Sequence, residues 1–178
     1  MTTLPIRPPF TSPSPLSTSP LRRTRVLTVV ATLFLAQNAF GNLYEQNTAL
    51  RSLVAPSPGA FIGALEIGSP MYYYMPWSLI GLAAAVWLVV RMHRMALPAA
   101  RRGRVALGLL AVAATSKTLL ITTVNPVFRD PGETADRVRD LTVLWLAGNG
   151  LTILTTAAAV ILLLSWRAGA ADSASRAK

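Results

Sequence analysis

A single lysine interrupts one of the four apolar stretches of this 178-residue chain. Lys117 lies in the segment TSKTLLITTVNP, and an ammonium group is among the most costly side chains to place in hydrocarbon. Ionisable residues at such positions face the bundle interior or a water-filled cavity, and they often belong to functional sites. Lys117 is therefore a candidate general base or a charge partner for an anionic group.

Further polar or amphipathic residues occur at matching depths in the neighbouring stretches. Depth can be estimated by centring each stretch on the bilayer and allowing 1.5 Å per residue. Three levels result, at about 5, 11 and 16 Å outward of the midplane. From the midplane outward, they hold Asn38, Lys117 and Asn149, then Asn42, Thr122 and Trp145, and then Glu45 and Asn125. The shared depths predict that these residues meet inside one bundle.

Their spacing within each stretch supports the same interpretation. Asn38, Asn42 and Glu45 follow an i, i+4, i+7 pattern, which is one face of a helix. Thr118, Thr122 and Asn125 repeat this pattern, and Trp145 and Asn149 are four residues apart. The sequence therefore predicts a polar cleft that opens outward between the first, third and fourth helices, with Lys117 at its floor. The candidate catalytic residues are Lys117 and Glu45. The candidate substrate-binding residues are Asn38, Asn42, Thr122, Asn125, Trp145 and Asn149.

A direct pair between Glu45 and Lys117 is marginal on this scale. Their backbones differ by about 12 Å in depth, which a lysine reaching outward and a glutamate just fail to span. A slide of the first helix, or a bridge through Asn42 or water, would close the gap. The alternative role of the asparagines is to hold the helices together through interhelical hydrogen bonds.

The hydropathy pattern predicts an all-α membrane protein. A helix needs about 20 apolar residues to cross roughly 30 Å of hydrocarbon. Four stretches have about this length, at residues 26–43, 71–90, 105–124 and 141–164. They predict a transmembrane domain over 26–166, a four-helix bundle, between a Pro/Ser/Thr-rich tail at 1–25 and a short tail at 167–178. The first stretch is longer than the core of a secretory signal and lacks a small-x-small cleavage site, so we expect a retained helix.

The distribution of basic residues predicts the orientation. Twelve of the 17 lysines and arginines flank the stretches on one side, namely before residue 26, within 91–104 and after 166. Four lie on the other side, in 44–70 and 125–140. The positive-inside rule therefore places both termini in the cytoplasm, in a multi-pass plasma-membrane protein. The apolar part of the first outer loop, within residues 52–70, fits a short interfacial helix.

The composition excludes several functional classes. The net charge is +10, but the basic residues flank apolar stretches, so they indicate membrane topology and not nucleic-acid binding. The chain has no cysteine and one histidine, His93, so no protein-built metal site and no cofactor is predicted. The predicted partners are the lipid bilayer and a lipophilic small molecule, and no oligomeric state is indicated.

Three short motifs resemble those of anthrone oxygenase-like proteins, a family of small four-helix membrane proteins. The motifs are Gly41-Asn42-Leu43-Tyr44-Glu45, Thr123-Val124-Asn125-Pro126, and Trp145 followed four residues later by Asn149. The resemblance covers roughly residues 26–166, although Thr152 stands where the family often has an arginine. It implies cofactor-free attack of O₂ on an activated polycyclic phenol. A base such as Lys117 would form the substrate anion, and asparagine donors would stabilise it.

Three functions are therefore open at this point. The first is an oxygenase-like enzyme that acts on a lipophilic small molecule. The second is a binding or transport protein that takes up a solute from outside. The third is an accessory membrane subunit in which the polar residues serve only to join the helices.

Overall fold

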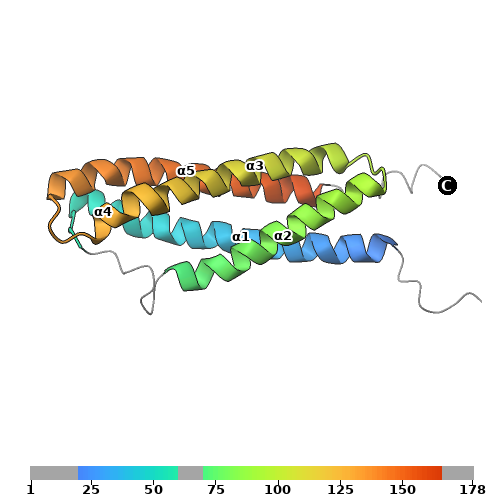
Figure 1. Ribbon diagram of the computed structural model, residues 1–178, viewed down its shortest axis with the longest axis horizontal. Helices are drawn as coiled ribbons and strands as arrows, with labels where there is room; N and C mark the ends of the chain where they lie inside the picture. Colours follow the sequence, from blue (N-terminus) through green and yellow to red (C-terminus); the bar gives the residue numbers. More distant parts are fainter. Residues whose placement is uncertain (1–19, 60–69, 166–178) are drawn as a thin grey trace, which may run out of the picture.

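The computed structural model of the protein describes residues 20–59 and 70–165, and Figure 1 shows its arrangement of long helices. In chain order the elements are α1 (Pro20–Val54), α2 (Pro70–Arg94), α3 (Ala100–Leu119), the π-helical turn η1 (Leu120–Val124), α4 (Asn125–Arg129) and α5 (Ala135–Leu164). The described residues contain no strand. The prediction of an all-α, four-helix membrane bundle is confirmed.

Four continuous helical segments are long and apolar enough to cross a membrane. They are Arg22–Val54, Tyr74–Arg94, Ala100–Arg129 and Ala135–Leu164. Only 22% to 33% of their apolar windows is buried within the protein, so most of the apolar surface points outward. Phe40, Trp87 and Leu154, for example, are each about two-thirds or more exposed. Such a surface is stable in contact with lipid tails, and the chain is therefore a multi-pass membrane protein.

The helices pack as an antiparallel bundle. α1 packs against α2 and α5, and α3 packs along α5 (Figure 1). Small residues permit the close contacts: a Cβ on Gly81 of α2 would lie 3.1 Å from the backbone nitrogen of Leu35 in α1. Two apolar clusters result, one around Leu35, Leu88 and Leu110, and one around Val124 and Phe128.

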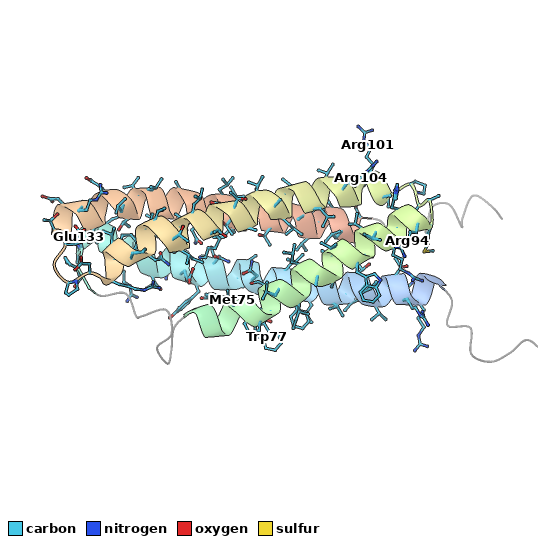
Figure 2. All side chains as sticks on the ribbon, in the orientation of Figure 1. Met75, Trp77, Arg94, Arg101, Arg104 and Glu133 are labelled. Atoms are coloured by element: carbon cyan, nitrogen blue, oxygen red, sulfur yellow. The ribbon has the colours of Figure 1, made fainter. Side chains whose placement is uncertain are left out.

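The helical domain begins and ends at the same end of the bundle. α1 starts and α5 ends at the same end, where the turn from α2 to α3 also lies (Figure 1). Figure 2 shows Arg94, Arg101 and Arg104 at this end and Glu133 at the other. The charge separation used for the topology prediction is thus present in the fold, while the assignment of the basic end to the cytoplasm stays a prediction.

The helices extend beyond the apolar stretches from which they were predicted. α1 begins at Pro20 and not at Val26, and it continues to Val54, eleven residues past Leu43. Residues 44–54 were expected to start the first outer loop. They are helical because this part of α1 still packs against α5, and Ala49 is buried in that contact. The interfacial helix expected within 52–70 falls largely outside the described residues, as do the tails at 1–19 and 166–178.

The third span contains a wide turn that the sequence interpretation did not predict. We expected the helix to stop at Asn125-Pro126, but it continues through η1 into α4. A proline lacks the N–H for an α-helical bond, and its ring clashes with the carbonyl four residues earlier. The π-turn relieves this conflict, and the Asn125 N–H bonds instead to the Leu120 carbonyl, five residues back.

Candidate functional site

Lys117 and Glu45 form a direct ion pair inside the bundle. The Lys117 Nζ lies 2.5 Å from the Glu45 Oε2, and their side chains are only 22% and 15% exposed. The pair joins α3 to α1. The prediction of a marginal contact is therefore wrong. It placed the middle of the first helix near residue 35, whereas α1 is centred near residue 37, which reduces the depth difference to about 8 Å.

The ammonium group has two further neighbours, both on α5. It donates a hydrogen bond of 3.0 Å to the Asn149 Oδ1. It also lies 5.2 Å from the centre of the Trp145 ring, within cation–π range. The charge of Lys117 is thus stabilised by an anion, an amide oxygen and an aromatic face, so a cation is well accommodated at this depth.

Asn149 is the most connected residue of the site. It is fully buried, and its amide nitrogen donates 2.8 Å bonds to the Asn42 carbonyl and to the Gln46 Oε1. Gln46 in turn donates a 3.0 Å bond to the Leu146 carbonyl. Sequence reasoning missed Gln46, although it lies one turn after Asn42 and beside Glu45. These bonds fix the rotamer of Asn149 and therefore the position of the Lys117 ammonium.

A second polar group lies next along α1 and involves α2. The Asn38 Oδ1 accepts a 2.8 Å bond from the Ser78 hydroxyl, and the Asn42 Nδ2 donates a 2.7 Å bond to the Asn38 carbonyl. Asn42 is only 2% exposed, and its Oδ1 has no hydrogen-bond partner among the described residues. The predicted site drew on three helices, but Ser78 and Tyr74 bring in α2 as well. The Tyr74 hydroxyl donates to the Gly41 carbonyl at 3.2 Å.

The remaining two predicted residues have opposite placements. Asn125 faces inward, and its Oδ1 accepts a 3.1 Å bond from the indole N–H of Trp145, which is 2% exposed. Thr122 lies on the outer surface and bonds back to the carbonyl of Thr118 at 2.9 Å. The prediction that Thr122 lines the cleft is therefore wrong.

The π-turn accounts for Asn125. In a continuous α-helix Asn125 lies about 80° around the axis from Lys117. The wider turn of η1 advances less per residue, which brings Asn125 back toward the interior while Thr122 stays outside. π-Turns of this kind often occur at functional sites.

The bonded groups define what this arrangement can do chemically. Glu45, held beside a fixed cation, is the carboxylate placed to accept a proton, and Lys117 is placed to stabilise an anion. The assignment of Lys117, as a candidate base or charge partner, and of Glu45 to catalysis stays a prediction. Within residues 20–59 and 70–165, no three His, Cys, Asp or Glu side chains gather where they could hold a metal ion.

Comparison of the chain with protein-family models, with curated proteins and with solved structures gives no match. The resemblance to anthrone oxygenase-like proteins is therefore untested beyond its motifs. Two of these motifs do supply contacting residues, since Glu45 and Asn149 are both within hydrogen-bond distance of the Lys117 Nζ.

Proposed function

We propose that this protein is a membrane enzyme that binds a lipophilic small molecule at the Glu45–Lys117 pair and removes a proton from it. The observation that carries the proposal is the ion pair itself, which is enclosed by three membrane-spanning helices and yet remains partly exposed. An ion pair in a low-dielectric interior often contributes less to stability than apolar residues of the same shape would. Ionisable residues within spans accordingly tend to serve function.

The pair supports an exchange of partners during proton transfer. When the Glu45 carboxylate takes a proton from the substrate, it loses its charge and its hold on Lys117 weakens. The Lys117 ammonium then faces the newly formed substrate anion, and Asn149 and Trp145 keep the ammonium in place. The charge that develops in the reaction is thus met by a cation that is already oriented, which is the most effective form of electrostatic stabilisation.

The motif resemblance favours O₂ as the second reactant. A carbanion formed at a CH₂ between two aromatic rings is electron-rich enough to reduce O₂ without a cofactor. The product is a peroxide anion, to which the protonated Glu45 returns its proton. Loss of water from the hydroperoxide leaves a carbonyl group, so the net change is CH₂ plus O₂ to C=O plus H₂O. The reaction class is that of a cofactor-free oxygenase.

The test is oxygen consumption by the purified protein in lipid nanodiscs with anthrone-like compounds. Glu45→Gln and Lys117→Met are each expected to reduce turnover by at least about a hundredfold, as the loss of a catalytic acid or base does. Asp136→Asn is the matched control, because it removes a carboxylate from an exposed ion pair with Arg139. Unchanged turnover in Glu45→Gln would refute the role of this carboxylate.

A purely structural role is the second candidate, and one observation favours it. Asn149 is fully buried with both ends of its amide bonded inside the bundle, as in a group that only joins helices. The exchanged variant Glu45→Lys/Lys117→Glu separates the two roles. The exchange restores an ion pair and stability but moves the carboxylate from α1 to α3. If Glu45 is the base, turnover stays lost. If the pair is only structural, turnover returns to the level of the unchanged protein.

Transport is distinguished by the fate of the solute. In proteoliposomes an enzyme converts the anthrone-like compound to its oxidised product. Accumulation of the unchanged compound inside the vesicles would instead favour the transport function.

A further inference from the structure

A cavity of about 400 Å³ lies between the start of α1 and the end of α2. It is lined by Arg22, Arg23, Val26, Leu27, Trp87 and Arg91. The cavity is distinct from the Glu45–Lys117 site, because Arg22 precedes Glu45 by 23 residues, or about 35 Å along α1. It lies at the basic end of the bundle, where Figure 2 shows Arg94.

The lining residues form three charged-over-apolar pairs. On α1, Arg22 is followed four residues later by Val26, and Arg23 is followed by Leu27. On the antiparallel α2, Trp87 precedes Arg91 by the same four residues. The Cα atom of each arginine is therefore about one helical turn, about 6 Å, nearer to the helix end than that of its apolar neighbour. Both helices thus present positive charge at the rim and apolar surface beneath it.

The position of these pairs coincides with the membrane boundary. Arg22 begins the first candidate span, and the second ends at Arg94, one turn beyond Arg91. Val26 and Trp87 are 55% and 66% exposed, so their apolar surfaces face the lipid. Arg91 is held in place by a 3.1 Å bond from its Nε to the Thr24 hydroxyl. The rim is therefore partly preorganised.

We propose that this cavity binds an anionic phospholipid of the adjacent leaflet. Guanidinium groups match phosphate oxygens in a bidentate geometry, and basic pockets at this depth are suited to anionic headgroups. The apolar lower half accommodates the glycerol region and the start of an acyl chain, which a free phosphate lacks. The remaining charge is complementary as well, since the acidic residues of the described segments, apart from Glu45, lie at the far end, in 130–140.

The experiment measures contact between lipid and Trp87 in detergent micelles of the full chain. Phosphatidylglycerol or phosphatidylcholine with brominated acyl chains is added, and tryptophan quenching is recorded. Subtracting the Trp87→Phe signal isolates the contribution of Trp87. Half-quenching is expected at a mole fraction of phosphatidylglycerol about a hundredfold lower than that of phosphatidylcholine, because three arginines line the cavity and each contributes about a fivefold factor.

Two charge variants decide whether the cavity or the general surface charge causes the preference for phosphatidylglycerol. Arg22→Gln/Arg23→Gln is expected to raise the phosphatidylglycerol requirement about thirtyfold, because each arginine near a lipid surface contributes about a fivefold factor. Arg101→Gln/Arg104→Gln removes the same charge from the same end, outside the cavity, and is expected to change it less than twofold.

Three outcomes would overturn the proposal. Equal half-quenching by the two lipids would exclude a headgroup preference. Equal effects of the two charge variants would show a diffuse electrostatic attraction. Displacement of the brominated lipid by millimolar glycerol 3-phosphate would show a site for a soluble phosphate in place of a lipid.

Discussion

The energetic coupling between Glu45 and Lys117 is the most direct measure of how the site is built. At 2.5 Å and an effective dielectric constant near 20, two unit charges attract by about 7 kcal/mol. Desolvation of both groups offsets much of this, and breaking a buried pair costs about 3–5 kcal/mol. Because 22% and 15% of the two side chains remain exposed, the loss should not exceed the middle of that range.

The two single variants differ in what they leave behind. Lys117→Met leaves a carboxylate facing hydrocarbon and removes the bond to Asn149 and the contact with Trp145, so we expect a loss of about 4 kcal/mol in the free energy of unfolding. Glu45→Gln leaves Lys117 with these two partners and an amide oxygen, so we expect about 2 kcal/mol. The double variant has no unpaired charge, and its loss should not exceed that of Lys117→Met. The coupling energy is then about 2 kcal/mol.

The assay is equilibrium unfolding in mixed micelles titrated with a denaturing detergent, followed by circular dichroism for all four proteins of the cycle. The exposed pair Asp136–Arg139 is the matched control, and its coupling should stay below about 0.5 kcal/mol. If the losses for Glu45 and Lys117 are additive, with a coupling no larger than that of the control, the conclusion that the pair is direct and partly buried is refuted.

Three further predictions concern packing, the π-turn and topology. A Cβ on Gly41 would overlap the Tyr74 ring, so Gly41→Ala should lower the free energy of unfolding by about 1–3 kcal/mol. In Gly41→Ala/Tyr74→Ala the ring is absent, so the second substitution should relieve the overlap. Since the chain has no natural cysteine, Thr122→Cys should react with a lipid-soluble pyrene maleimide much faster than Asn125→Cys, and adding Pro126→Ala, which permits a regular helix, should reduce that difference. Reporter fusions should show cytoplasmic signals after the second and fourth spans and an external signal in the first loop; the fusion points are Ala100, Lys178 and Ala60.

The architecture was accessible from the sequence because its signal is long and redundant. Each stretch has about 20 mostly apolar residues, and a helix of that length crosses the bilayer with its backbone hydrogen bonds made within the segment. Helix ends were less accessible. The apolar stretch ends at Leu43, but α1 continues through polar residues to Val54 because tertiary contacts with α5, such as the Gln46 bond to the Leu146 carbonyl, stabilise the extra turns.

The errors within the site have separate causes. The depth estimate separated Glu45 from Lys117 because it used the apolar stretch and not the whole of α1. The angular estimate grouped Thr122 with Thr118 and Asn125 on one polar face, although 100° per residue already places Thr122 about 140° around the axis from Lys117. Pro126 was the local signal for the π-turn, but it was interpreted as a helix stop.

The hydrogen-bond pattern around Asn42 differs from that around Asn149. A group that only joins helices is expected to satisfy all of its buried polar atoms, as Asn149 does. The Asn42 Nδ2 is committed to the Asn38 carbonyl at 2.7 Å, which leaves the buried Oδ1 as an acceptor without a donor. The backbone carbonyl of the same residue accepts from Asn149, which also holds Lys117. The Asn42 Oδ1 is enclosed as well as unpaired, and the Thr156 hydroxyl is the other such atom among the described residues. An unpaired buried acceptor therefore does not mark a binding site by itself, and the proposed function depends on the Glu45–Lys117 pair, which remains partly exposed.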